Sequence, residues 1–524
     1  MTNRRYILFL VLLCAAVLQV SAVTQRGYVK TIARPDHPSE RVNGVLIRVQ
    51  GARNTVQSRD SGTFAILMPD LQNGDPYALS RVYISGYVPA EQELIGRQMP
   101  CSDRVPLVIN LVNQQELLRE KQAITERAMM QMEKRFAERN KWLEEQLAAK
   151  VLTEAEFNER LMKLTDRYDR FEPLANAMAE TYARTDLDNL DELSGKINAA
   201  IEAGDWREAG RLMSRKDNLD KREQQIRATD RQLAAAQTVI DSSQNVLNER
   251  KRLNDAQRRE LAEDLYRMYS ICLMRFDNDS AGIYIERRAQ LDTTNVDFQL
   301  QAGQYVRDMM ADSKAAMAYF RRAYRIAESL YGEQSGQMST VCHETGITYK
   351  LLADTTAAMT WLKRALSIRE TIRGKESPAV AETLNSLGEL YRMTNDMKRA
   401  TECFKRSLKI REKHFGPNSL QAATGKNNLA YLYAKQGKTT QAERLFKQVY
   451  AILSNHPEAS KVNLAKLLTN LVAVEYMSGN YPAAIEYAEQ SVALCNKVLG
   501  ERHPLTHSAI KMQQEVMKKS TEIQ

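Results

Sequence analysis

The sequence predicts a mostly helical protein in which an α-solenoid of helix pairs follows a small β-sandwich and a charged helical spacer. Three observations support this prediction. One pattern returns every 42 residues in the C-terminal half, a charged segment with almost no glycine precedes it, and short β-rich runs come first. A repeat of this length indicates a solenoid, because each unit buries its apolar face only against its neighbours.

The 42-residue step holds in several columns of the sequence. One column contains Gly332, Gly374, Gly416 and, two steps further on, Gly500. A second column contains Ala358, Ala400, Ala442 and Ala484. Five residues before each alanine stands a residue that we expect to break the helix: Ala353, Asn395, Gly437 or Gly479. Each unit therefore predicts two helices joined by a tight turn.

Within a unit the apolar residues follow helical spacing. Leu384, Leu387, Gly388 and Tyr391 lie at i, i+3, i+4 and i+7. The arrangement resembles the tetratricopeptide repeat in the long form found in kinesin light chains. The signature of that family, small–aromatic–alanine–aromatic, falls on Gly388, Tyr391, Ala400 and Phe404. The resemblance covers roughly residues 263 to 515 and implies a protein-binding superhelix, here in an exported bacterial protein.

The N-terminus has the pattern of a secretory signal peptide. Arg4-Arg5 precedes an apolar run from Tyr6 to Val20, and Val20-Ser21-Ala22 is a small-residue cleavage site. We expect export to the periplasm or the cell exterior. No later stretch approaches the length of about 18 apolar residues that a spanning helix needs, so no transmembrane helix is expected after signal removal.

Residues 23–112 predict a small β-sandwich. The expected strands are 27–32, 45–49, 64–68, 78–84 and 105–111, separated by turn residues such as Gly51-Ala52 and Asn73-Gly74-Asp75. The runs Gly44–Val49, Asp60–Phe64 and Gly86-Tyr87 resemble the carboxypeptidase regulatory-like domain. That resemblance implies a structural or binding module without protease chemistry.

Residues 113–260 predict a charged helical or coiled-coil spacer. Leu117, Ile124, Phe136, Leu143 and Leu147 form a partial seam, and Thr153–Glu156 is a capping box that opens a second helix up to Pro173. We expect a helical hairpin or short coiled coil; the alternative is a long dimerising rod. A divergent repeat-like helix pair is expected near residues 190–215. The superhelix then covers 261–503, and a capping helix and tail cover 504–524.

Composition gives limited information about partners. The formal net charge is +9, and charged residues of both signs make up 27% of the chain. This mild excess, without base-stacking aromatic clusters, does not predict nucleic-acid binding. Five cysteines remain after signal removal, widely spaced and odd in number, which argues against disulfides and zinc sites. We expect buried free thiols, except for Cys101, which is expected to be exposed.

No pattern predicts an enzyme, a cofactor or a metal ion. Gly437-Lys438-Thr439 lacks the upstream glycine and the strand of a phosphate-binding loop, so we interpret it as a turn between helices. His503 and His507 lie four residues apart without a nearby carboxylate or thiol partner. Catalytic residues, a cofactor and a metal site are therefore not predicted.

The candidate site is the groove of the superhelix. In the tetratricopeptide family the first helix of each pair lines the groove, so the resemblance implies a peptide-binding face. The candidates on that helix are His343, Lys350, Asn385, Arg392, Asn427, Asn428, Tyr431, Asn470 and Tyr476. Asparagine amides can both donate to and accept from an extended backbone. A carboxylate clamp is not predicted, because the basic residues are scattered.

A second set of basic residues follows the second helix of each pair. It contains Arg321, Lys363, Lys405 and Lys447, with Arg322, Arg364 and Arg406 beside them. We interpret it as a solvated outer face; the alternative is a basic stripe for an acidic partner or an anionic membrane surface.

The predicted function is that of a non-enzymatic exported scaffold or adaptor that binds a protein or an extended peptide in the superhelical groove. The alternative is a self-assembling envelope protein that forms a homodimer through the charged helices of residues 113–260.

Overall fold

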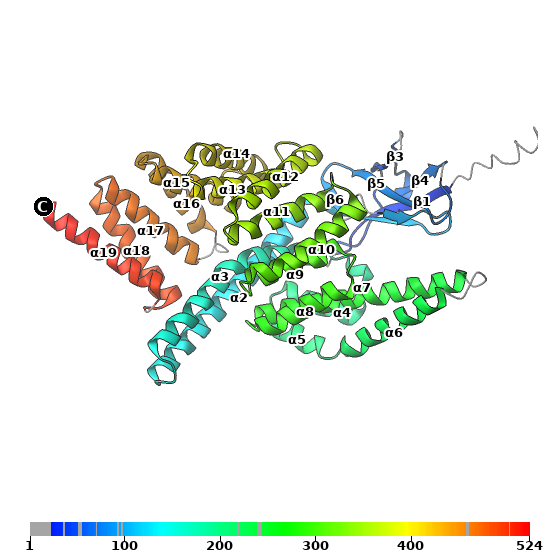
Figure 1. Ribbon diagram of the computed structural model, residues 1–524, viewed down its shortest axis with the longest axis horizontal. Coiled ribbons are helices and arrows are strands. Elements are labelled where there is room, and N and C mark those ends of the chain that lie inside the picture. The colour runs from blue at the N-terminus through cyan, green and yellow to red at the C-terminus, as the bar shows by residue number, and fades with distance from the viewer. Residues whose placement is uncertain are drawn as a thin grey trace, which may run out of the picture. The chain divides into compact units, whose positions relative to one another are not determined.

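The structure is a computed structural model that describes residues 23–34, 37–50, 55–69, 71–91, 94–95, 98–216, 219–237, 244–456, 461–501 and 503–523. The predicted signal peptide and the predicted turn at Gly51-Ala52 lie outside these residues. The described chain is 72% helical, with 18 helices and two small sheets (Figure 1). It forms two compact units: residues 1–120 with 180–191, and residues 121–179 with 192–524.

The first unit contains two four-stranded sheets with the strand orders β4-β1-β8-β6 and β3-β2-β5-β7. Their strands are β1 (Val23–Thr31), β2 (Leu46–Val49), β3 (Val56–Gln57), β4 (Thr63–Met68), β5 (Pro76–Tyr83), β6 (Tyr87–Pro89), β7 (Gln98–Pro100) and β8 (Leu107–Asn113). β1 pairs antiparallel with β4 and parallel with β8. Strict alternation of exposed and buried residues along β4 directs one face to a core that includes Val29, Ile47, Leu79 and Ile109.

Cys101 differs from its prediction. We expected an exposed thiol, but the residue is only 1% exposed. Its backbone pairs with the turn at Gly74-Asp75, and its Sγ donates to the carbonyl oxygen of Gln72. The turn therefore covers the thiol, which the sequence pattern around Cys101 did not indicate.

The segment after the second long helix belongs to the β unit. The Asp186 carboxylate accepts the N–H of Ala33 at 2.9 Å and forms an ion pair with Lys30 at 2.9 Å. Arg184 donates to the carbonyl oxygen of Pro89 at 2.8 Å. Backbone and charged groups of the β unit thus hold residues 180–191.

The spacer contains an antiparallel pair of helices, α2 (Gln114–Ala148) and α3 (Glu154–Ala183). The rings of Phe136 and Tyr168 lie 5.0 Å apart between them. Thr153 and Glu156 exchange hydrogen bonds as a capping box at the start of α3. We refer to residues 121–179, the part of this pair in the second unit, as the strut.

The predicted end of the second helix at Pro173 is wrong, because α3 continues for ten residues beyond it. Proline inside a helix costs about 3 kcal/mol. On the neighbouring turns Phe171, Ala175 and Met178 are fully buried. Burying such side chains stabilises by about 1.5–3 kcal/mol each for the large ones, which offsets the loss.

The remaining helices form successive pairs, which Figure 1 shows one after another along the second unit. They are α4 (Glu192–Glu202), α5 (Trp206–Met213), α6 (Leu219–Gln237), α7 (Gln244–Met274), α8 (Asn278–Leu291), α9 (Val296–Asp308), α10 (Ser313–Tyr331), α11 (Gly336–Leu351), α12 (Thr355–Arg373), α13 (Pro378–Met393), α14 (Met397–Phe415), α15 (Leu420–Lys435), α16 (Thr439–Asn455), α17 (Lys461–Met477), α18 (Tyr481–Leu499) and α19 (Pro504–Ile523).

The turn inside each pair is built the same way throughout. A residue with positive φ precedes the recurring alanine by five positions, at Gly204, Phe276, Ala311, Ala353, Asn395, Gly437 and Gly479. In most pairs the next residue is an aspartate whose side chain accepts a backbone N–H of the following helix, as Asp396 does from Arg399. The predicted breaks are therefore confirmed, and the column extends further towards the N-terminus than the 42-residue step.

Small residues allow the two helices of a pair to approach. A Cβ atom on Gly388 would lie 2.6 Å from a ring carbon of Phe404, closer than real side chains come. Ala400 and Ala442 are completely buried. Glycine and alanine in these columns thus set the spacing on which the solenoid depends.

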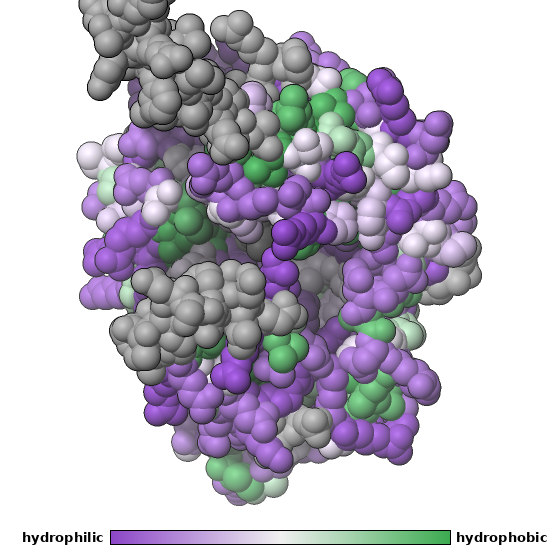
Figure 2. All heavy atoms as spheres, turned by 90° about the vertical axis from the view of Figure 1, so that its right-hand side faces the viewer, coloured by the Kyte–Doolittle hydropathy of each residue, from purple (hydrophilic) through white to green (hydrophobic). Residues whose placement is uncertain are grey.

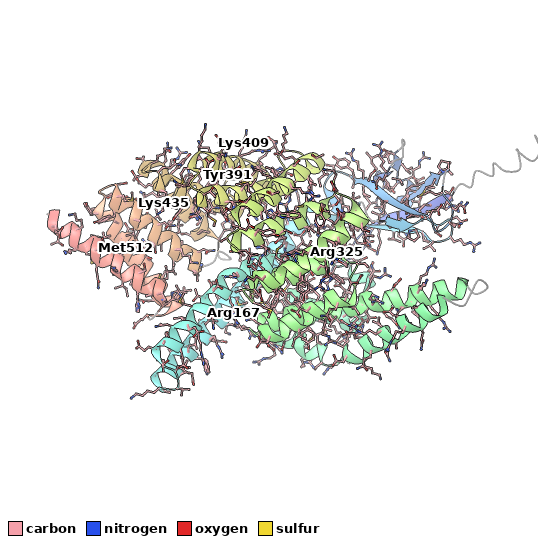
Figure 3. All side chains as sticks on the ribbon, viewed as in Figure 1. Arg167, Arg325, Tyr391, Lys409, Lys435 and Met512 are labelled. Carbon is pink, nitrogen blue, oxygen red and sulfur yellow. The ribbon has the colours of Figure 1, made fainter. Side chains whose placement is uncertain are left out.

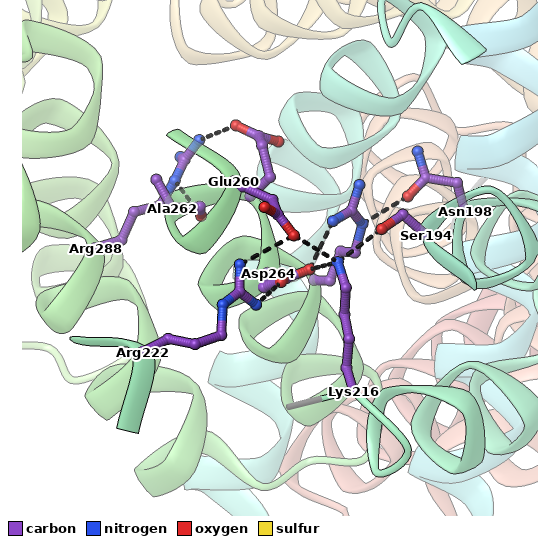
Figure 4. A network of polar contacts seen from close by, with 10 residues as sticks. Ser194, Asn198, Lys216, Arg222, Glu260, Ala262, Asp264 and Arg288 are labelled. Carbon is purple, nitrogen blue, oxygen red and sulfur yellow. Dashed lines mark hydrogen bonds and ion pairs between the residues drawn. The ribbon is translucent and has the colours of Figure 1, made fainter. Parts of the chain in front are cut away.

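A buried charged network joins the early helices of the second unit (Figure 4). The carboxylate of Asp264, which is 0% exposed, lies 2.8 Å from both Lys216 Nζ and Arg267 Nη1 and also pairs with Arg222. Arg267 donates further to Asn198 at 2.8 Å. A buried carboxylate needs such partners, so the network fixes α4, α6 and α7 to one another.

Candidate functional site

The predicted groove residues lie on four helices, α11, α13, α15 and α17, which we call the A helices. The side chains of Lys350, Arg392, Tyr431, Asn470 and Tyr476 are half-buried, as are the three asparagines at 385, 427 and 428. We call this set, without His343, the A-helix face. The residues stand at 42-residue intervals on equivalent turns, so they form rows that run from repeat to repeat.

His343 does not share this position. Its side chain is 1% exposed, and burial, assisted by Arg369, lowers its pKa to about 3. The neighbouring Glu344 is also buried and binds Arg307 of α9 at 2.6 Å. The ring is therefore neutral and enclosed, so the row that contains Asn385 and Asn427 begins at α13, and Lys350 is the candidate that remains on α11.

Hydrogen bonds link the A-helix face across three repeats. Lys350 of α11 donates to Glu389 of α13, and Asn385 donates to the other oxygen of the same carboxylate at 3.0 Å. Asn428 of α15 in turn donates to Asn385 Oδ1 at 2.8 Å. Two of the four predicted asparagines therefore bind each other, and the Asn427 side chain has no hydrogen bond among the described residues.

An aromatic ring between two cations lies next to this network. Arg392 lies 5.4 Å and Lys435 5.7 Å from the centre of the Tyr431 ring. Figure 3 labels Lys435 on α15. Further along, Tyr476 packs edge-on against Tyr481 at 5.8 Å. The face thus offers flat rings beside positive charge.

The sequence analysis did not predict one further row of residues, although this row keeps the same 42-residue step. Leu351, Met393 and Met477 follow the columns of Lys350, Arg392 and Tyr476 by one residue and are 51%, 51% and 57% exposed. Lys435 stands in the same row. These exposed apolar side chains stand on equivalent turns of the A helices. The periodicity could have identified this row.

The strut binds the ends of two helices that lie far apart in the sequence, α9 and α17. Glu133 accepts the backbone N–H of Lys461, the first residue of α17, at 3.2 Å. Arg170 donates to the carbonyl oxygens of Arg307 and Asp308 at the end of α9, at 3.4 and 3.1 Å. A carboxylate at a helix N-terminus and a cation at a C-terminus both suit the helix dipole.

A third set of contacts fixes the strut at the last repeat. Asn140 Nδ2 donates to the carbonyl oxygen of Leu499, the end of α18, at 2.7 Å. The next residue, Gly500, has φ +84°, and a Cβ there would lie 2.5 Å from Glu144 Oε1. At the equivalent Gly332, Gly374 and Gly416 nothing lies within 4 Å of such a Cβ. The last glycine therefore also makes room for the strut.

His503 completes this contact in a neutral form. Its Nδ1 accepts the N–H of Leu505 at 3.0 Å, and its Nε2 lies 2.8 Å from the hydroxyl of Thr165. That hydroxyl donates to the carbonyl oxygen of Leu161, so Nε2–H is the donor to Thr165. Burial, and to a smaller extent the positive charge of the nearby Lys466, lowers the pKa of His503 to about 4. The histidine acts as a helix cap, and no group of metal-ligating side chains occurs among the described residues.

The apolar face of the strut is used within the chain. Met132, Phe136, Leu161, Leu164 and Phe171 are at most 7% exposed. A dimerising rod would need such residues for a second copy. Homodimer formation through residues 113–260 is therefore not favoured.

Three of the seven residues in the predicted basic row on the second helices form ion pairs. Arg364 lies 3.7 Å from Glu333, Arg406 binds Glu370 at 2.5 Å, and Lys447 lies 2.8 Å from the buried Glu475. These pairs join consecutive repeats. A solvated face with ion pairs between repeats describes the row better than an open cationic stripe does. Figure 2 shows the side of the molecule at the right of Figure 1, where the coloured residues are mainly hydrophilic and the apolar ones form small separate groups.

Comparison with known protein families agrees with this geometry. A family described as tetratricopeptide repeat matches residues 360–413 and 379–455, and a second family with the same description matches 464–505. The chain contains tetratricopeptide repeats. No curated protein matches the sequence. Within the described residues, none of the helices is long and apolar enough to cross a membrane.

Several solved structures are similar to part of this chain. BtubC (BKLC) from P. vanneervenii is 20% identical, with a TM-score of 0.38, and the match covers 46% of this chain and 94% of that one. A putative kinesin light chain from Podosopora anserina is 18% identical, with a TM-score of 0.34, covering 39% and 97%. MamA is 16% identical, with a TM-score of 0.27, covering 36% and 95%.

Proposed function

We propose that this protein is a non-enzymatic scaffold that binds a protein partner, as an extended segment, along the A-helix face. Tetratricopeptide repeats suggest protein interaction, and the observation that favours this face is its composition. It places half-exposed amides and rings beside the exposed row of Leu351, Met393 and Met477. Apolar side chains of a partner would pack on that row, and its backbone would bind the amides.

Fewer residues of the A-helix face are free to contact a partner than the predicted set contains. Asn385 and Asn428 are engaged with Glu389 and with each other, so a partner must compete for them. Asn427, Tyr431 and Met393 can bind a partner without breaking such a bond. These three residues are the proposed centre of the site.

We also propose export and a carboxypeptidase regulatory-like identity for the β unit. The signal-peptide pattern of residues 1–22 supports the first, and the paired sheets with the Asp60–Gly62 turn support the second. Edman sequencing or mass spectrometry of the protein purified from its own cells tests export. A mature chain that begins at Val23 is expected, whereas a retained Met1 would contradict it.

The proposed binding face is tested by affinity capture from an extract of the source cells. The Asn427→Ala/Tyr431→Ala variant is expected to lose a partner that wild type retains, because it removes an amide and a ring from the face. The matched control is Lys363→Ala/Lys405→Ala, which changes exposed residues on α12 and α14. Circular dichroism checks that both variants fold. Loss in the control alone would assign binding to the second helices.

A further inference from the structure

A cavity of about 990 Å³ lies among α14, α15 and α16. Leu408, Tyr433 and Leu445 contribute its apolar walls, and Glu412, Lys426 and Arg444 contribute its charged groups. None of the residues of the A-helix face lines it. The volume is at the upper end of the range for ligand sites in proteins.

The equivalent position contains a pair of aromatic rings in two other repeats, and Leu366 with Cys403 in a third. Tyr324 and Trp361 meet edge-on at 5.7 Å between α10 and α12, and Tyr450 and Tyr487 at 6.0 Å between α16 and α18. Tyr324 and Tyr450 occupy the same repeat column as Leu408, and Trp361 and Tyr487 occupy the same column as Leu445.

A smaller cavity lies at the equivalent place beside Tyr324 and Trp361. It measures about 580 Å³ and shares four columns with the larger one: those of Leu408, Leu429, Tyr433 and Leu445. The larger cavity has two leucines in the columns where the smaller one has two rings, which leaves more apolar space between the second helices.

Lys426 places a positive charge beside the larger cavity, in a repeat column that otherwise contains apolar residues. The equivalent residues are Cys342, Leu384 and Leu468, all buried and apolar. Lys426 is only 5% exposed; its Nζ donates to the carbonyl oxygen of Pro417 at 2.8 Å and lies 3.3 Å from Glu412. A buried ammonium is costly unless it is compensated. With Arg444, two cations face one carboxylate, so the charged groups of the lining sum to one positive charge.

We propose that this cavity is a binding site for an aromatic carboxylate. The ring of the ligand occupies the space that Tyr324–Trp361 and Tyr450–Tyr487 fill in their own repeats. Its carboxylate binds between Lys426 Nζ and the guanidinium of Arg444 and balances the excess charge. The same chemistry occurs in a free aromatic acid and in a polypeptide that ends in phenylalanine. The proposal is independent of the A-helix face.

The test uses the full chain and 3-phenylpropionate, with 3-phenylpropanamide as the uncharged analogue, followed by ligand-observed NMR titration. Wild type is expected to bind the acid saturably and the amide at least tenfold more weakly. Lys426→Leu installs the residue found at 384 and 468, so it is expected to fold and to lose the preference for the acid. Lys405→Leu, an exposed lysine of α14, is the matched control and is expected to bind like wild type.

A second variant tests the space itself. Leu408→Tyr/Leu445→Trp reproduces the pair found at Tyr324 and Trp361, and it is expected to abolish binding of the acid while the protein remains folded. A peptide with a C-terminal phenylalanine, compared with its amidated form, distinguishes a chain end from a free acid as the source. Equal binding of the acid to wild type and to both variants, or no saturable binding to wild type, would overturn the proposal.

Discussion

Gly500 differs from its equivalents through what lies beside it rather than through its backbone. Gly416 has φ +87° and Gly500 has φ +84°, so alanine is strained at both, by about 1–3 kcal/mol. Only at Gly500 would the new Cβ also meet Glu144 and Asn140 of the strut.

We therefore predict that Gly500→Ala lowers the free energy of unfolding more than Gly416→Ala does. Urea denaturation measures both values, and hydrogen exchange of residues 130–145 reports on the strut. The exchange is expected to rise in Gly500→Ala alone. Equal effects of the two substitutions on stability and on exchange would show that the strut does not depend on this glycine.

Lys438 occupies the N-cap position of α16, where five other second helices have a capping aspartate. Its side chain makes no capping hydrogen bond. We predict that Lys438→Asp stabilises the protein by about 1 kcal/mol, because it supplies the missing acceptor for a free helical N–H. Thermal unfolding measures the change. The reverse substitution, Asp396→Lys, is the control and is expected to destabilise α14 by a similar amount.

At the scale of elements, the strut contains a pH-dependent contact at His503. The unfolded pKa is near 6.5, and the folded pKa is lowered to about 4. The unfolded chain therefore binds more protons between these values, and stability falls as pH drops from 6.5 to 4. The two pKa values limit the loss to about 3 kcal/mol.

Thermal unfolding of wild type and His503→Asn at pH 7 and at pH 4.5 tests this contact. Asparagine keeps an acceptor for the N–H of Leu505 but does not titrate. The wild-type protein is expected to lose more stability on acidification than the variant, and the difference removes the contribution of other groups. A variant that loses as much as wild type would contradict the assignment.

The sequence could predict the helices and turns whose residues recur at the repeat interval. The 42-residue step located the turn at Asn395 and the buried Ala400 because each repeat obeys the same packing rule. Strands β3, β6 and β7 were not predicted, since two or three residues leave no pattern. The contact of Asn140 with Leu499 spans 359 residues and has no counterpart in other repeats, so no periodicity could reveal it.

The repeat columns predicted only part of the candidate site. The columns placed Asn427 and Tyr431 on one helix face, where both are half-buried. They could not show that His343 is enclosed, because its burial depends on packing around Glu344 and Arg307. The 42-residue step also relates Leu351, Met393 and Met477, but apolar residues at helical spacing resemble ordinary core positions, so their exposure could not be predicted.

At the scale of the molecule, the strut and the A-helix face are separate parts of the second unit. The strut binds α9, α17 and the residues that join α18 to α19, whereas the proposed binding centre lies on α13 and α15. Ion pairs between successive repeats, such as Lys350 with Glu389, hold the middle repeats in register. We therefore expect a partner to bind the middle repeats while the strut stays in place.

The central claim is that a protein partner binds the A-helix face, and site-specific photo-crosslinking tests it most directly. A benzoylphenylalanine replaces Met393 on that face in one variant and Lys405 on the second helix of the same pair in another. After irradiation in the source cells, the account predicts a crosslinked partner at position 393 and none at 405. The same adduct at both positions, or an adduct at 405 alone, would contradict it.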